Sequence, residues 1–170
     1  MAAEEVSQRV GRERGGLVWL WLSALVLALD QLSKVMALAW LVPYQPVPLT
    51  GFFNLTLSFN PGAAFSFLND AGGWQRWLFV TLAVAVCAFL GVWLYRDSPP
   101  RRLGAAGIAL VIGGALGNVY DRVMREGLVV DFLDFHAFGR HYPIFNLADS
   151  AICVGVALIV LFATGTGRRD

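Results

Sequence analysis

Long apolar runs alternate with short polar segments along the chain, and four of these runs are long enough to cross a lipid bilayer. They cover about residues 17–41, 77–95, 103–120 and 150–166. A helix needs about 20 mostly apolar residues to span the hydrocarbon core of a membrane. The second and fourth runs carry no charged residue, whereas the first contains Asp30 and Lys34. The pattern therefore predicts an all-α integral membrane protein with four transmembrane helices.

A different pattern follows the first run, where apolar and polar residues alternate strictly in residues 53–60, FNLTLSFN. A period of two is typical of a strand with one apolar face and one polar face. Residues 128–135, LVVDFLDF, are rich in the β-branched and aromatic residues that strands favour. We therefore expect a small β-structure that rests on the outer membrane surface. In the first strand the expected apolar face is Phe53, Leu55, Leu57 and Phe59, and the polar face is Asn54, Thr56, Ser58 and Asn60.

The composition agrees with a membrane protein. Of the 170 residues, 57% are apolar and 15% are charged, whereas soluble domains have about 45–50% and about 25%. The mean hydropathy is +0.61. The net charge of +1 gives no reason to expect a nucleic-acid partner. Cys87 and Cys153 lie inside apolar runs, without the spacing of a metal site or a disulfide framework. Residues 1–170 are expected to form a single membrane domain.

The distribution of arginines orients the predicted helices, because cytoplasmic flanks carry an excess of Lys and Arg. The loop of residues 42–75 has neither residue type, and the loop of residues 123–146 has only Arg125 and Arg140. We therefore expect both longer loops on the periplasmic side and both termini, including the tail of residues 1–16, in the cytoplasm. The arginines on the cytoplasmic side are then Arg9, Arg12, Arg14, Arg96, Arg101, Arg102, Arg168 and Arg169.

In this topology, polar side chains gather at the outer membrane face. The third run ends in GNVYDR, the fourth begins after FNLAD, and the segment VVDFLDF connects them. In the first two of these segments an Asn and an Asp are three residues apart, so each pair shares one helix face. The set at this face is Asn60, Asn118, Asp121, Arg122, Asp131, Asp134, Asn146 and Asp149.

Several members of this set also have ordinary structural explanations. Asp149 suits the N-cap position of the fourth helix, where the helix dipole favours a negative charge. Asp121 and Arg122 are able to form an interfacial ion pair. Asn60 precedes a Pro-Gly pair, which is typical of a turn. These explanations stay open at the level of the sequence.

The remaining carboxylates are harder to place. Asp131 and Asp134 fit solvated loop positions. Asp30 does not, because a carboxylate inside a membrane span is costly and marks a functional site by default. Lys34, four residues further on, is its natural ion-pair partner, although a long side chain is also able to reach outward to the membrane surface.

Taken together, at least three Asp and three Asn at one face of so apolar a protein indicate chemistry. Two carboxylates a few Å apart share one proton. The ionised member is then able to take a proton from water, and the protonated member is able to donate to a carbonyl oxygen. This is the chemistry of an aspartyl protease. The two histidines, His136 and His141, lack the spacing of a zinc protease, so no metal site is expected.

Five sequence blocks occur in an order that resembles the lipoprotein signal peptidase family, also called signal peptidase II. The blocks are LDQLSK, FNPGAAFSFL, GNVYDRV, VVDFLDF and FNLADSAI. The resemblance covers about residues 17–165. It implies an aspartyl protease of the bacterial inner membrane, with four transmembrane helices and a periplasmic β-cradle. Such an enzyme removes the signal peptide of a prolipoprotein just before the cysteine that carries a diacylglyceryl group.

The resemblance also implies roles for individual residues. Asp131 of VVDF and Asp149 of FNLAD match the catalytic pair, and Asp134 becomes a neighbour of lesser role. Asn60 and the turn from Gly62 to Ala64 are expected to bind the main chain of the substrate. No cofactor is expected, because water is the nucleophile, and the expected partners are lipid-modified prolipoproteins and membrane lipid, with the protein as a monomer. The supporting polar residues are Asn60, Gly62, Asn118, Asp121, Arg122, Asn146, Asp30 and Lys34.

Two other classes of function remain as alternatives. A proton-coupled transporter would use Asp30, Lys34 and Asp121 as an ion path, but it predicts charges deep in several helices. A non-enzymatic assembly factor would use the outer loops as a docking surface and would tolerate Asp131→Asn. A protease of the presenilin or prepilin-peptidase kind requires a Gly-x-Gly-Asp motif, which this chain lacks.

Overall fold

In the computed structural model, residues 16–62, 73–96 and 102–163 are described. Several expectations from the sequence therefore lie outside the described residues. They are the cytoplasmic tails of residues 1–15 and 164–170, Ala63 and Ala64 of the expected substrate turn, and the arginines Arg9, Arg12, Arg14, Arg101, Arg168 and Arg169.

Four α-helices occur in the described part of the chain, and each overlaps one of the long apolar runs, although three of them begin before the predicted bounds. They are α2 (Leu20–Trp40, preceded by the 3-10 turn η1, Leu17–Trp19), α3 (Gln75–Arg96), α4 (Arg102–Met124) and α5 (Leu147–Ala163). The first three are long and apolar enough to cross a membrane, which confirms three of the four expected spans as candidates by length and composition. Helix α5 is apolar but has only 17 residues, so its crossing of the membrane stays a prediction.

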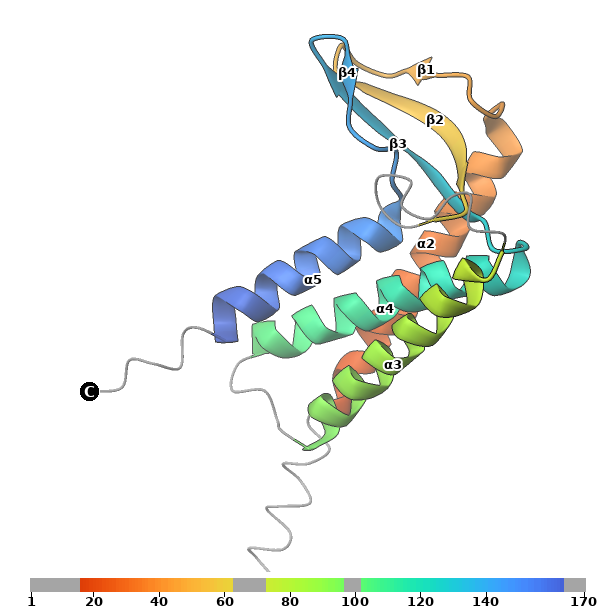
Figure 1. Cartoon of the computed structure of the whole chain (residues 1–170). Helices are drawn as coiled ribbons and strands as arrows, with labels where there is room; N and C mark the ends of the chain where they lie inside the picture. The colour runs from red at the N-terminus through yellow and green to blue at the C-terminus, as the bar shows by residue number, and fades with distance from the viewer. Residues whose placement is uncertain (1–15, 63–72, 97–101, 164–170) are drawn as a thin grey trace, which may run out of the picture.

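Helix α4 is the centre of the helical bundle and packs against α2, α3 and α5 (Figure 1). Its glycines and alanines allow close approach, as expected for membrane helices. A Cβ atom added to Gly107 would lie 2.8 Å from the carbonyl oxygen of Gly155 on α5. The two backbones are therefore in direct contact, and α5 is held tightly along α4.

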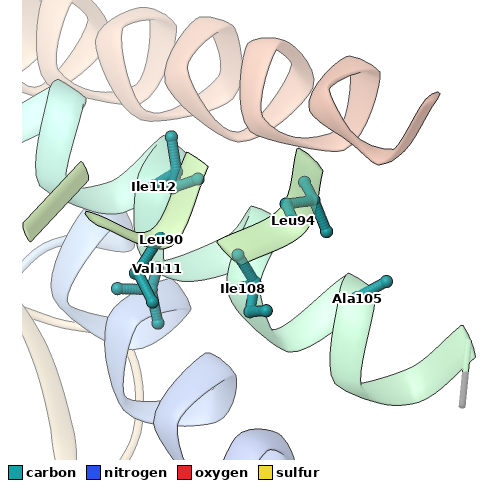
Figure 2. Close-up of a cluster of buried hydrophobic side chains, with 6 residues drawn as sticks. All are labelled: Leu90, Leu94, Ala105, Ile108, Val111 and Ile112. Carbon is teal, nitrogen blue, oxygen red and sulfur yellow. The ribbon is translucent and has the colours of Figure 1, made fainter. Parts of the chain in front are cut away.

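The main apolar core lies between α3 and α4, as Figure 2 shows. Leu94 and Ile108 are almost completely buried there. The opposite surface of α3 is exposed and apolar, with Phe89 being 67% exposed. An exposed apolar helix surface fits contact with lipid chains. The six core residues are Leu90, Leu94, Ala105, Ile108, Val111 and Ile112.

A small antiparallel sheet stands at the end of the bundle where α4 ends and α5 begins (Figure 1). Its order is β1 (Val47–Pro48), β2 (Phe53–Asn60), β3 (Val129–Ala137) and β4 (Arg140–His141). Both strands expected from the sequence are confirmed. Leu57, Val130 and Phe132 of the sheet pack on Ala37 of α2, which joins the sheet to the helices.

The expectation of one continuous polar face on β2 is wrong, because the pairing of β2 with β3 shifts register. Leu55 lies opposite Leu133, but Ser58 lies opposite Asp131. An extra residue in one strand reverses the face to which the following side chains point. The polar residues of β2 are therefore divided between two faces of the sheet.

This register shift separates the two aspartates of β3. Asp131 and Asp134 are three residues apart, so they point to opposite faces of the strand. Asn54, before the shift, lies opposite Asp134 and donates to its carboxylate, at 3.1 Å. Asn60, after the shift, donates to Asp131 at 3.1 Å. Each aspartate thus has its own set of partners.

Candidate active site

The first turn of α5 holds Asp149 through a reciprocal pair of hydrogen bonds. The backbone N–H of Asp149 donates to Oδ1 of Asn146 at 2.9 Å, and the N–H of Asn146 donates to Oδ2 of Asp149 at 3.3 Å. This is a capping box. The expectation that Asp149 is the N-cap is therefore wrong: the helix begins at Leu147, and Asn146 caps it. Asp149 is the third residue of the helix and lies in its first turn, where the helix dipole favours its charge.

Asp131 on β3 lies close to this turn and is 2% exposed. Its Oδ1 accepts a hydrogen bond from Nδ2 of Asn146 at 2.7 Å, and its Oδ2 accepts one from Nδ2 of Asn60 at 3.1 Å. Burial, together with the charge of Asp149, raises the pKa of Asp131 to about 7, although the two amide donors act in the opposite direction. Asp131 therefore holds its proton up to nearly neutral pH, where an exposed aspartate is ionised.

Two asparagines connect Asp131 with Asp149. Asn146 donates both to Asp131 and to Oδ1 of Asn118, the latter at 3.1 Å. Asn118 on α4 in turn donates to Oδ1 of Asp149 at 2.8 Å. Four polar side chains from β3, α4 and the start of α5 thus form one hydrogen-bonded unit. The spacing of three residues in FNLAD places Asn146 and Asp149 in one helix turn as the sequence predicts, whereas Asp121 of GNVYD contacts Lys34 and Arg125 and does not join this unit.

Both carboxylates line a cavity of about 1060 Å³ between the sheet and the ends of the helices. Apolar side chains, including Phe59, Ile144 and Ile152, form much of the wall. Because both carboxylates line this cavity, water is able to reach them in a mostly apolar pocket, as in many enzyme sites. The expected site residues that line this cavity are Asn60, Gly62, Asn118, Arg122, Asp131 and Asp149.

Asn60 and Arg122 hold the segment around Gly62 at the rim of the cavity. Oδ1 of Asn60 accepts a hydrogen bond from the N–H of Gly62 at 3.0 Å, so Asn60 is a turn residue as well as a partner of Asp131. Arg122 donates from Nη2 to the carbonyl oxygen of Gly62 at 2.8 Å. Its guanidinium lies over the ring of Phe79, 5.1 Å from the centroid.

The expected ion pair between Asp121 and Arg122 is wrong. Neighbouring residues on a helix point about 100° apart, so the two side chains diverge. Asp121 instead pairs with Lys34, at 2.9 Å, and with Arg125. Arg122 faces the cavity and Gly62.

A fully buried ion cluster lies beneath the cavity. Lys34 and Asp30 form the expected pair, with Nζ 2.9 Å from Oδ2. Lys34, Asp30 and Asp121 are all 0% exposed, so the expectation that Lys34 reaches outward to the membrane surface is wrong. Gln31 donates to both aspartates, at 3.0 and 3.1 Å.

Gln31 and Arg125 were not predicted from the sequence as site residues. Two signals were available. Gln31 lies between Asp30 and Lys34 in the block LDQLSK, and Arg125 follows Asp121 by four residues, the spacing at which opposite charges meet on a helix.

Asp134 belongs to a separate cluster on the other face of the sheet. It is 1% exposed and accepts hydrogen bonds from Asn54 at 3.1 Å and from Thr56 at 2.8 Å, while Nδ1 of His141 lies 2.7 Å away. Burial raises its pKa, but the hydrogen bonds from His141, Thr56 and Asn54 outweigh burial and lower it. The expectation that Asp131 and Asp134 are solvated loop residues is therefore wrong for both.

Comparison with known proteins identifies the family of this chain. The profile of the family described as Signal peptidase (SPase) II matches residues 22–164. Proteins named lipoprotein signal peptidase from Yersinia enterocolitica and Yersinia pestis are 50% and 52% identical over 145 residues, which is 85% of this chain and 85% of each relative. A solved bacterial membrane enzyme superposes with a TM-score of 0.78 at 29% identity, covering 90% of this chain and 92% of that one. A second solved structure has a TM-score of 0.76 at 30% identity, covering 89% and 94%. The chain therefore belongs to the signal peptidase II family, and it is an aspartic endopeptidase.

Proposed function

We propose that Asp131 and Asp149 are the catalytic pair, and that the enzyme removes the signal peptide from diacylglyceryl-modified prolipoproteins just before the lipidated cysteine. One observation carries this assignment. Both carboxylates line the same cavity, and Asn146 and Asn118 join them. The names of the relatives support the class of substrate.

The two carboxylates divide the work of hydrolysis. Asp149 is the ionised member and takes a proton from a water molecule, whose oxygen attacks the carbonyl carbon of the scissile amide. Asp131 is the protonated member, since its pKa is raised to about 7, and it donates to the carbonyl oxygen as the tetrahedral intermediate forms. When the C–N bond breaks, the proton held by Asp149 passes to the leaving nitrogen, and a hydroxyl of the tetrahedral intermediate returns its proton to Asp131 as the carboxyl product forms. The pair then again shares one proton.

The walls of the cavity place the substrate. The main chain of the substrate lies along the segment from Asn60 to Gly62, where a residue without Cβ permits close approach. Arg122 holds this segment through the carbonyl oxygen of Gly62. The diacylglyceryl chains stay in the bilayer beside the apolar helices, so membrane lipid is the second partner.

The protein lies in the bacterial inner membrane. We propose that its two termini are cytoplasmic, that α5 is a fourth span, and that the cavity opens near the periplasmic face of a monomer. The excess of arginines on one side of the predicted helices supports this orientation. The exposed apolar surface of α3 supports contact with lipid.

A cleavage assay with a lipid-modified precursor tests this function. The purified enzyme in lipid is given a diacylglyceryl-modified prolipoprotein and, separately, the same precursor without the lipid, and products are identified by mass spectrometry. We expect cleavage directly before the modified cysteine and at least about tenfold slower cleavage of the unmodified precursor, because the lipid anchors the substrate in the cavity. Cleavage at another position, or equal rates for both precursors, contradicts the proposed substrate class.

The pKa of Asp131 predicts the pH dependence of the reaction. A carboxyl with a pKa of about 7 is protonated below that pH and loses its proton above it. The general acid is therefore lost as pH rises, and kcat/KM, which reports the free enzyme, is expected to fall about tenfold per pH unit on the alkaline side. Measuring kcat/KM from about pH 5 to about pH 9 checks this. A constant kcat/KM up to about pH 9 contradicts the role of Asp131 as the proton donor.

A further inference from the structure

Lys34 occupies the centre of the polar layer beneath the proposed catalytic pair. Its ammonium group has three N–H donors and no acceptor. Three acceptors surround it: Oδ2 of Asp30 at 2.9 Å, Oδ2 of Asp121 at 2.9 Å and Oδ1 of Asn118 at 3.1 Å. The donors and acceptors match in number, so the ammonium is fully satisfied although it is completely buried.

The contact between Lys34 and Asn118 determines how the amide of Asn118 is oriented. An asparagine amide has an acceptor end and a donor end, and an ammonium group accepts no hydrogen bond. With Lys34 at Oδ1, Nδ2 of Asn118 points toward Asp149, to which it donates at 2.8 Å. A flipped amide would place NH₂ against the ammonium and an oxygen against the carboxylate. Lys34, together with Nδ2 of Asn146, which also donates to Oδ1 of Asn118 at 3.1 Å, therefore selects the orientation in which Asn118 supports Asp149.

The other two contacts lead to the backbone beside each catalytic carboxylate. Oδ2 of Asp121, which contacts Lys34, also accepts a hydrogen bond from the N–H of Val130 at 3.1 Å. Oδ1 of Asp30 accepts one from the N–H of Ala148 at 3.0 Å. Val130 directly precedes Asp131, and Ala148 directly precedes Asp149. Each aspartate held by Lys34 thus fixes the residue before one member of the pair.

The polar layer around Lys34 is better suited to positioning groups than to stabilising the fold, and its charges balance. Lys34 and Arg125 carry two positive charges, and Asp30 and Asp121 carry two negative charges. Buried ion clusters rarely stabilise a fold more than apolar side chains of the same volume do, because their charges lose hydration. Their advantage is a defined geometry, which catalysis needs.

From these contacts, and resting on the proposed function, we propose that Lys34 is a positioning residue for the reaction. It sets the amide of Asn118 and, through Asp30 and Asp121, the backbone on which both carboxylates stand. Misplacing a catalytic group by about 1 Å costs about 100-fold in rate. Lys34→Met is therefore expected to lower kcat by about 100-fold and to change KM by less than about threefold, since Lys34 does not line the substrate cavity.

The test compares Lys34→Met with a control on the same helix. Ser23 of α2 is buried and donates to the carbonyl oxygen of Ala109 on α4 at 2.8 Å. Ser23→Val disturbs the same helix pair without touching the polar layer. Assays of both are run below their thermal unfolding midpoints, and amide hydrogen exchange reports on Val130 and Ala148. We expect Ser23→Val to keep kcat within about threefold of the wild type and to keep these two amides protected from exchange. Lys34→Met is expected to lose both the activity and the protection of these amides.

A second variant covers the case in which Lys34→Met leaves too much uncompensated charge to fold. Lys34→Met combined with Asp30→Asn removes one charge of each sign and leaves the pair of Asp121 and Arg125 intact. It is expected to show the same loss of kcat. A folded variant with kcat within threefold of the wild type, or an equal loss in Ser23→Val at equal stability, overturns the positioning role. If the wild-type enzyme cuts no precursor, the proposed function itself is contradicted, and the positioning role of Lys34 with it.

Discussion

Asp131→Asn and Asp149→Asn are each expected to lower kcat by about 10³-fold or more, while Asp134→Asn keeps at least about a third of the wild-type value. An asparagine at either position of the pair is unable to take up or release the shared proton. Asp134 has the same chemistry and lies three residues from Asp131, but it points to the other face of β3 and its carboxylate bonds to Asn54 and Thr56. The measurement is kcat on the lipid-modified precursor.

Protein stability provides the control for this comparison. Asp134→Asn removes a buried charged acceptor, so it is expected to lower the free energy of unfolding by about 2 kcal/mol. Asp134→Asn is thus expected to be clearly destabilised and still active. This result would show that a loss of stability of this size does not by itself abolish catalysis. An inactive but folded Asp134→Asn together with an active Asp131→Asn would transfer the catalytic role to Asp134. If Asp131→Asn and Asp149→Asn are both active, the proposed catalytic pair is contradicted.

Gly114→Val is expected to lower kcat by about 100-fold although it changes no polar group. A Cβ atom at this position of α4 would overlap the carbonyl oxygen of Ala148 and lie 2.9 Å from Cγ1 of Ile152. Backbone atoms cannot move aside as a flexible side chain does, so α5 must shift. Asp149 follows Ala148 directly, and its 2.8 Å bond from Asn118 is lost with the shift.

Gly91 of α3 is the matched control for this substitution. Apart from the neighbouring backbone of α3 itself, no atom lies within 4 Å of a Cβ atom placed there, while the change in helix propensity is the same. Gly91→Val is expected to keep kcat within about twofold, because it alters no contact of the site. The measurement is kcat and the thermal unfolding midpoint of both variants in the same lipid. Wild-type kcat in Gly114→Val would mean that α5 tolerates displacement, and that tight packing of α4 on α5 does not position Asp149.

Local patterns in the sequence were sufficient for much of the fold. Hydropathy predicted the four helices, of which three are confirmed as candidate spans, and a period of two predicted β2 with its observed bounds of 53–60. These features depend on residues adjacent in the chain, since a run of apolar side chains or their alternation determines how a segment is buried. The spacing of Asn and Asp at the ends of the helices also indicated which residues gather at one face.

Tertiary structure alone decided which groups contact one another. The register shift in β2 assigned Asn60 to Asp131 and Asn54 to Asp134, and no alternation of residue types reveals a shift that depends on the partner strand. Asn146, and not Asp149, caps α5.

Lys34 was placed by the same kind of long-range contact. It is buried because α4 supplies Asp121 and Asn118 at its tip. The bond from Ala148 to Asp30 joins residues 118 positions apart. The burial of an apolar segment follows from its local composition, but the burial of a charged side chain and its hydrogen-bond partners follow from how distant segments pack. The geometry of the candidate active site is made of such partners.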